Sequence, residues 1–296
     1  MNYLSLLGKL AYIISVIIIL SSSIITRSYA ISEVKLLPGF VPGDQRYYYP
    51  DLVLKEALRA TVDSDGPFEI TYAAEAMKRK RALSELIIGK LVNVHIAATQ
   101  DAWERSTIPI RIPVLKGLLG YRLLLVHKDD LEMFKTLRDL NELKKLKAGS
   151  GSQWTTTAIL QKLGFNVVPG TDYEGLFAML NLHRFNYFPR GVNEIFHEFD
   201  SRKNTYQNIA IEPTKVLYFP TPSYFFISPK HPELADRLRR GLNIIIQNGV
   251  FDRLFEDYYG EVILRAQLTD RILFKLENPL LSPETPFNRP EVWFTP

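Results

Sequence analysis

Apolar residues in the first 120 positions recur at two spacings, and these spacings predict strands that alternate with helices. An alternation of period two marks short strands, a continuous apolar run marks a buried strand, and spacings of three and four mark helices. The predicted strands are Glu33–Leu37, Phe68–Tyr72 and Val92–Ala97, and the predicted helices are Tyr47–Val62 and Ala73–Ile88. This order is typical of a layered α/β unit with a mainly parallel sheet.

The same alternation continues after residue 120. The predicted strands there are Tyr121–Val126, Phe165–Val168, Arg184–Phe188 and Lys215–Phe219, and the predicted helices are Leu131–Lys147, Thr155–Leu163, Tyr173–Asn181, Ile195–Phe199 and Pro232–Tyr259. Residues 266–296 contain five prolines, which predicts an extended tail on the surface. With 296 residues, the chain is long enough for two lobes.

The first 30 residues have the pattern of an export signal. Lys9 gives a positive start, Leu10–Ile25 is apolar, and Ser28-Tyr-Ala30 is a small-x-small cleavage site. We therefore expect cleavage after Ala30 and a periplasmic protein with no membrane span. An uncleaved anchor is the alternative, but Ser21–Ser23 interrupts a run already shorter than the ~20 residues that a bilayer needs.

Composition excludes several kinds of chemistry. The chain has no cysteine, so disulfides, thiol catalysis and thiolate metal sites are impossible. The formal net charge is +4, and removal of the signal leaves about +2, too little to indicate nucleic-acid binding. The five histidines lack metal-ligand spacing and no Gly-x-Ser-x-Gly occurs, so we expect neither a metal, nor a cofactor, nor an enzyme. Lys78–Arg81 is interpreted as a solvated helix face.

A small-residue turn at Ala148–Thr157 is the strongest local signal for a ligand. A strand end, then glycine, serine and threonine, then a helix, exposes backbone N–H groups and the positive end of a helix dipole. Such a turn suits a carboxylate or a phosphate. The alternative is structural, because Ser152 or Thr155 can serve simply as an N-cap and the glycines as a tight turn. It is not a P-loop, since no Gly-Lys-Ser/Thr follows.

Three segments in this order resemble the type II periplasmic solute-binding proteins, family 3, best known for polar amino acids. They are Glu85–Thr99, Ala148–Thr157 and Tyr224–Glu233 with the following helix to Gly260. The resemblance implies a two-lobed α/β fold, each lobe a mainly parallel sheet flanked by helices. Residues 31–118 and 223–265 would form the first lobe, with the 266–296 tail lying on it. Residues 119–222 would form the second, joined by hinges near Gly117–Tyr121 and Phe219–Ser223.

The resemblance also implies site residues. In the second lobe these are Ser150, Ser152, Gln153, Trp154, Thr155 and Thr156, from the turn that holds the ligand's anionic group. The family places its carboxylate-binding arginine three residues after a threonine that ends a strand, but Ala102 occupies that slot after Thr99. Arg111 or Arg105 is the expected substitute. Tyr48 and Trp103 are the expected aromatic walls. Arg190 and Glu194 stand where the family has an aspartate that grips an amino group.

The implied function is capture of a small polar solute that carries an anionic group, by closure of the two lobes, for an ABC-type importer. We expect a monomer that works with a membrane permease or a sensor. Three alternatives stay open: a periplasmic ligand sensor, a module that has lost its ligand and binds a protein, and a dehydratase-like enzyme on the same fold. The enzyme would need an acid between the lobes, and Glu104 and Glu194 are the candidates.

Overall fold

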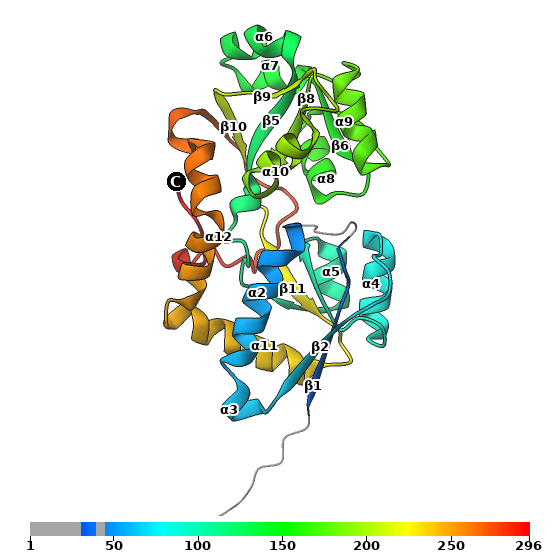
Figure 1. Cartoon of the computed structure of the whole chain (residues 1–296), viewed down its shortest axis with the longest axis vertical. Coiled ribbons are helices and arrows are strands. Elements are labelled where there is room, and N and C mark those ends of the chain that lie inside the picture. Colours follow the sequence, from blue (N-terminus) through cyan, green and yellow to red (C-terminus); the bar gives the residue numbers. More distant parts are fainter. Residues whose placement is uncertain (1–30, 40–44) are drawn as a thin grey trace, which may run out of the picture.

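The computed structural model describes residues 31–39 and 45–296, which form two α/β lobes stacked end to end (Figure 1). The export signal expected at residues 1–30 lies outside the described residues. Within the described ranges, no helix is both long enough and apolar enough to cross a membrane.

The first lobe is built on five strands, and Asn93 joins them into one layer. The strands are β1 (Ser32–Leu36), β2 (Phe68–Tyr72), β3 (Val94–Ala98), β4 (Ile108–Ile110) and β11 (Ser223–Ile227). β1 pairs with β2 in parallel, and β11 pairs with β3 and β4 in antiparallel. Between β1 and β3 the buried Asn93 amide accepts from the Lys35 N–H (2.7 Å) and donates to the Glu33 carbonyl (2.8 Å). The Asn93 N–H also donates to the Lys35 carbonyl (3.0 Å), so the backbone and the side chain of Asn93 together connect β1 to β3.

Helices of the first lobe cover both faces of this layer. They are α2 (Gln45–Arg59), α3 (Val62–Asp65), α4 (Arg79–Ile88), α5 (Asp101–Ser106) and α11 (Pro232–Gln247). α2 and α11 approach closely because residue 241 is glycine: a Cβ there would meet the Ala57 backbone. The buried guanidinium of Arg237 donates to carbonyls at the end of α2 and in the following turn, including Gly66 O at 2.6 Å.

The second lobe has a mixed sheet with the strand order β12-β10-β5-β8-β6-β7, and β9 also pairs with β5. The strands are β5 (Tyr121–His127), β6 (Lys147–Gly151), β7 (Asn166–Gly170), β8 (Tyr187–Gly191), β9 (Ile209–Ile211), β10 (Lys215–Tyr218) and β12 (Ile272–Lys275). The helices are α6 (Leu131–Thr136), α7 (Leu140–Lys145), α8 (Thr155–Lys162), α9 (Tyr173–Asn181) and α10 (Val192–Arg202). β5 is entirely buried, as its apolar run predicts. β8 is also entirely buried, and it begins three residues later than the predicted strand Arg184–Phe188.

The chain passes from the first sheet to the second between β4 and β5, returns between β10 and β11, and enters the second sheet again through α11 and α12 at β12. The first two of these passages matter most here. The two passages touch at Gly120, where an added Cβ would lie 2.6 Å from the Phe219 carbonyl oxygen and 3.3 Å from the Thr221 nitrogen. Only a residue without a side chain allows these backbones to come so close.

The C-terminal part of the chain differs from the sequence prediction. We expected one helix over Pro232–Tyr259, but Gly249 adopts φ +74°, which ends α11 and starts α12 (Val250–Ala266) in a new direction. We also expected the 266–296 tail to lie on the first lobe. Its beginning departs from this expectation, because β12 extends the sheet of the second lobe by pairing in parallel with β10. Further along, Arg289 of the tail donates to Asn243 of α11 in the first lobe.

Two other predicted helices are shorter or divided. Ala73–Ile88 is helical only from Arg79, because Ala73 still donates to the Leu36 carbonyl (2.9 Å) and continues the strand. Leu131–Lys147 breaks between α6 and α7, where Asp139 accepts from the Asn141 N–H (3.0 Å) and caps a new helix. Local hydrogen bonds therefore override helical periodicity at both places.

Substitution of Gly120 by alanine tests the close contact of the two passages. Because the nearest atom, at 2.6 Å, is a backbone oxygen, it cannot move aside cheaply, and we expect a loss of about 1–3 kcal/mol in the free energy of unfolding. Urea unfolding followed by circular dichroism measures it. Gly175→Ala in α9 is the control, since its Cβ would meet side-chain atoms of Asp172 only, the nearest at 3.1 Å. Equal stability of Gly120→Ala and the parent protein would contradict this account.

Candidate functional site

The turn from β6 to α8 has two kinds of hydrogen-bond donor, backbone N–H groups and a hydroxyl, that find no partner among the described residues. The backbone N–H groups of Thr155 and Thr156 stand in the first turn of α8, where no intrahelical acceptor exists, and no other acceptor in the described part of the chain takes them. The Thr155 hydroxyl, in a side chain only 5% exposed, likewise has no partner among the described residues. Unsatisfied buried polar groups are unfavourable, so the Thr155 hydroxyl makes this turn a candidate site for a ligand group.

The remaining residues of this turn have structural partners or face the solvent. Ser150 is buried, with its hydroxyl 2.7 Å from that of Thr157, which also donates to the Gly151 carbonyl (2.6 Å). Ser152 and Gln153 are exposed, and the Ser152 N–H donates to the Gly170 carbonyl (2.8 Å). Hydrogen bonds of Ser150, Thr157 and the Ser152 N–H thus fix the turn, while the side chains of Ser152 and Gln153 face the solvent.

Trp154 is held rigidly beside the turn. Its indole stacks on Phe188, with ring centroids 6.0 Å apart and an interplanar angle of 14°, and the Arg190 guanidinium carbon lies 4.6 Å from its centroid. Trp154 is half-buried, so one part of the ring stays accessible. Of the aromatic residues that the sequence suggested, Trp154 is the one that lies beside the start of α8 with part of its ring accessible.

Arg190 and Glu194 form a buried ion network with each other. Arg190 makes a bidentate pair with Glu198 (2.6 and 2.7 Å) and contacts Glu194 at 3.0 Å. Burial acts to lower the pKa of the Arg190 guanidinium, but the two carboxylates raise it overall. Glu194 also caps the Gly191 N–H (3.1 Å) and faces Arg122 at 4.0 Å. The network positions Trp154 and the start of α10, and its charges are already matched.

Arg111 in the first lobe is also matched by acids. Its guanidinium donates to Glu104 (3.1 Å from Nε, 3.0 Å from Nη2) and pairs with Glu284 of the C-terminal tail. Glu104 in turn accepts from the Thr99 hydroxyl. Arg111 therefore links the tail to the end of β3.

The two expected aromatic residues of the first lobe lie apart from each other. Tyr48 is 56% exposed and stacks on Tyr258 of α12, with centroids 5.8 Å apart. Trp103 is fully buried in α5 and packs against Phe226 and His95, with centroids 5.3 Å apart in each pair. Trp103 therefore belongs to the core of the first lobe and offers no open ring face to a solute, whereas Tyr48 lies on the surface beside α12.

Arg79, which we interpreted as part of a solvated helix face, is the charged residue at the end of β3. It donates to the Ala98 carbonyl (2.5 Å) and to Gln100 Oε1 (3.2 Å), and its guanidinium carbon lies 5.0 Å from the Trp103 ring centroid. No carboxylate among the described residues forms an ion pair with it. Burial lowers its pKa to about 10, so it is still charged at neutral pH. Burial, and then the charge of Arg79, lowers the pKa of His95 to about 3, which keeps this neighbour neutral.

Sequence reasoning missed Arg79 because Lys78–Arg81 has four adjacent basic residues and no apolar marker. In the structure α4 begins at Arg79, and this start brings the Arg79 side chain to the end of β3. Its neighbour Lys80 is exposed on the same helix. Nothing in the sequence of Lys78–Arg81 distinguishes the half-buried Arg79 from its exposed neighbours.

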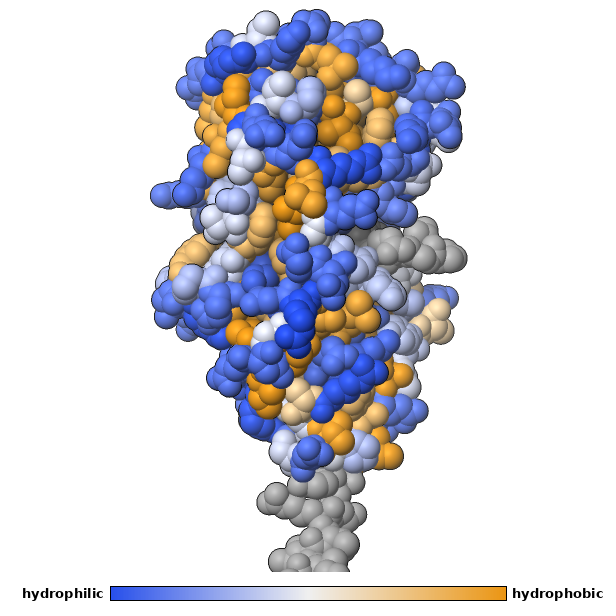
Figure 2. Space-filling view, turned by 60° about the vertical axis from the view of Figure 1, so that its left-hand side comes forward, coloured by the Kyte–Doolittle hydropathy of each residue, from blue (hydrophilic) through white to orange (hydrophobic). Residues whose placement is uncertain are grey.

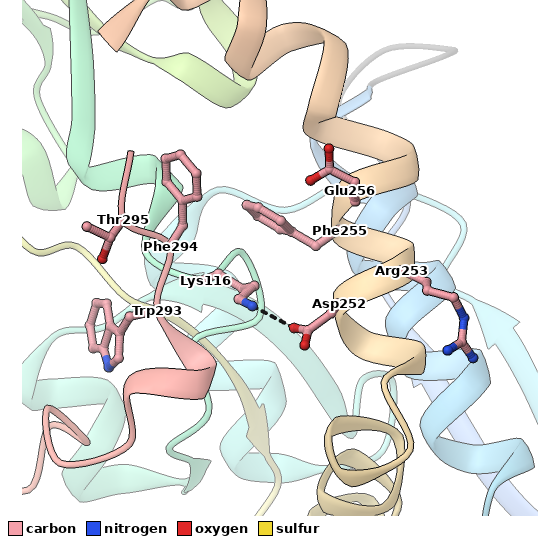
Figure 3. Close-up of a pocket in the computed structure, with 8 residues that line it drawn as sticks. All are labelled: Lys116, Asp252, Arg253, Phe255, Glu256, Trp293, Phe294 and Thr295. Atoms are coloured by element: carbon pink, nitrogen blue, oxygen red, sulfur yellow. Dashed lines mark hydrogen bonds and ion pairs between the residues drawn. The ribbon is translucent and has the colours of Figure 1, made fainter. Parts of the chain in front are cut away.

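A separate pocket of about 460 Å³ lies between α12 and the end of the tail (Figure 3). Phe255, Trp293 and Phe294 give it aromatic walls, and Lys116 and Asp252 form an ion pair at 2.6 Å across it. Figure 3 shows Arg253 pointing away from the tail. None of the expected binding residues lines it. In residues 31–39 and 45–296, no cluster of three or more acidic or histidine side chains is arranged to hold a metal ion.

The sequence matches no protein-family model and no curated protein. Solved structures, however, match the fold over most of its length. An ancestral arginine-binding protein bound to arginine aligns with a TM-score of 0.57 at 16% identity, over 77% of this chain and 99% of that one. The form bound to glutamine gives 0.55 at 15% identity, over 78% of this chain and 100% of that one.

A further match comes from a study of glutathione import via GshT and the cystine ABC importer TcyBC of Streptococcus mutans, with a TM-score of 0.55 at 14% identity, over 78% of this chain and 96% of that one. At such identities the likeness concerns the fold. The chain therefore has the α/β fold of the two-lobed type II periplasmic binding proteins, in the form that amino-acid-binding members share.

Proposed function

We propose that this protein captures a small polar solute with a carboxylate group between its two lobes and delivers it to an ABC-type importer. The observation that carries the proposal is Arg79: a half-buried cation at the end of β3 with no carboxylate partner among the described residues. A guanidinium suits a carboxylate because it offers two parallel N–H donors. Arg79 would bind the carboxylate in place of the arginine that the family has at the position of Ala102.

The second lobe supplies complementary groups. The unpartnered N–H groups of Thr155 and Thr156, the Thr155 hydroxyl and the start of α8 all favour an oxygen-rich, negatively polarised group. Figure 1 shows α4, α5 and α8 on the side of the molecule opposite α12. A solute held by both Arg79 and the α8 turn would favour the closed arrangement of the lobes, since only that arrangement offers both sets of contacts.

The comparisons support the class of solute. Proteins of this fold include ones bound to arginine and to glutamine, both of which carry a carboxylate. We extend that class to this chain, together with export to the periplasm and partnership with a membrane permease. The proposal includes no covalent chemistry, because both acids that an enzyme would use already have partners. Glu104 pairs with Arg111 and accepts from the Thr99 hydroxyl, and Glu194 pairs with the buried Arg190.

A ligand screen tests the function. The protein beginning at Ile31 is heated with amino acids, small organic acids, inorganic phosphate and sugars in turn. A solute at 100 times its dissociation constant should stabilise the fold by about 2.7 kcal/mol, a shift of several degrees in melting temperature. We expect the shift with carboxylate-bearing compounds. A shift with sugars or phosphate only, or with no compound, would contradict the proposal.

Substitution of Arg79 by alanine should weaken binding of the solute found in the screen about 10- to 100-fold, since a charge-assisted hydrogen bond contributes ~1.5–3 kcal/mol. Isothermal titration calorimetry measures the dissociation constant. The affinity of Arg79→Lys should lie between those of the parent protein and Arg79→Ala, because lysine keeps the charge but loses the parallel pair of N–H donors.

Arg105→Ala is the matched control for Arg79. Arg105 lies in the same lobe, is 76% exposed and pairs with Asp101 within α5. It removes the same charge from the same region, so a long-range electrostatic effect would weaken binding in both variants alike. Equal losses in Arg79→Ala and Arg105→Ala would show that Arg79 does not contact the solute.

Thr155→Val should lower the affinity for the solute, whereas Thr157→Val should lower the stability of the free protein. Thr155 loses a hydroxyl that has no partner, so the free protein should be as stable as before while the affinity falls about 2- to 10-fold. Thr157 loses bonds to Ser150 and Gly151, so the free protein should lose about 1–3 kcal/mol. Urea unfolding and calorimetry separate the two. Loss of stability without loss of affinity in Thr155→Val would leave that hydroxyl a structural role only.

A further inference from the structure

The C-terminal segment Ile272–Pro296 contacts both lobes and both passages between them. We infer that this segment, here called the strap, is a third connection between the lobes that restricts how far they rotate. The matched structures cover 77–78% of this chain but 96–100% of their own length. The chain therefore has residues beyond the shared fold, and the strap is argued from its own contacts, independently of any ligand.

The strap begins firmly in the second lobe. β12 pairs in parallel with β10, and Arg271, just before it, donates to the carbonyls of Ala266 (2.7 Å), Glu212 (2.6 Å) and Lys215 (3.3 Å). Phe274 is buried in the core of this lobe. This end of the strap therefore moves with the second lobe.

The middle of the strap crosses to the first lobe beside the return passage. Asn278 donates to the Pro220 carbonyl (2.7 Å), which lies between β10 and β11. Glu284 then pairs with Arg111, and Arg289 donates to Asn243 of α11 (3.1 Å). Arg111 and α11 belong to the first lobe, so the strap is attached on both sides of the passage.

The end of the strap returns to the first passage. The Phe294 N–H donates to the Lys116 carbonyl (2.7 Å), and the Phe294 ring lies 5.8 Å from Tyr121 and 5.9 Å from Phe255 by centroid. Trp293 fills the space beside Gly117, where a Cβ would clash with its ring. The strap thus packs on the residues whose backbone must turn if the lobes rotate.

α12 reinforces the strap on the same side. It contacts α2 and α11 of the first lobe, and near its end Arg265 pairs with Asp200 of α10 in the second lobe at 2.7 Å. Figure 2, which brings this side of the molecule forward, shows the two lobes meeting without a gap. Rotation is therefore least restricted on the opposite side, where α4 and α8 lie (Figure 1).

Double electron–electron resonance, which measures the distribution of distances between two spin labels, tests the strap. The sequence has no native cysteine, so only introduced cysteines would carry labels. Ser84→Cys in α4 and Gln161→Cys in α8 are both exposed and carry one spin label each. The free protein is measured with the strap intact and with the double substitution Asn278→Ala and Glu284→Gln. We expect a broader distance distribution in the variant, because the lobes sample more angles once the strap is loosened.

Glu277→Gln is the matched control, since it removes an exposed acid next to Asn278 that has no ion-pair partner among the described residues. Its distribution should match that of the parent. Circular dichroism checks that each variant is folded, and the single substitution Glu284→Gln, which changes only an exposed carboxylate, gives a milder form of the same test. Identical distributions for the parent, the single and the double variant would overturn the inference. Because the solute is absent, this result does not depend on the proposed function.

Discussion

The contact between Gly120 and the Phe219–Thr221 backbone is the constraint on which the two-lobed arrangement depends. Every residue of the second lobe before β12 lies between these two passages, so their separation fixes how the lobes meet. A side chain at residue 120 would force the passages apart and, with them, the aromatic residues around Tyr121. The strap and α12 then pack on this junction from one side only. We propose that the lobes approach each other on the opposite side, where Arg79 and the α8 turn are located.

Charge pairing distinguishes the structural residues from the candidate binding residues. Arg190 and Arg111 are the arginines that family resemblance favours, and each is neutralised by two acids, either in the second-lobe network or between the strap and α5. Breaking such a partly buried pair leaves an unpaired charge, which is unfavourable. Arg79 differs because its partners are a carbonyl, an amide oxygen and an aromatic ring. It is oriented by neutral groups and keeps its charge available.

The fold was largely predictable from the sequence, and the candidate site was not. The strand β2 and the helix α9 follow directly from periodicity, since each has one consistent apolar face. The strand β5 follows from its continuous apolar run. The breaks at Asp139 and Gly249 escaped prediction because a single cap or a single left-handed residue outweighs the helical pattern around it. The Ala148–Thr157 turn was found from its small residues. Arg79 was not found, because its role depends on β3, α4 and α5 meeting in space, and no local spacing encodes that meeting.

A crystal structure of the protein with the solute identified by screening tests the central claim most directly. The account predicts that the solute lies between α4 and α8, with its carboxylate oxygens within hydrogen-bond distance of the Arg79 guanidinium. It also predicts a solute atom within reach of the Thr155 hydroxyl. A solute bound in the pocket between α12 and Trp293, or an Arg79 side chain with no solute contact, would contradict it.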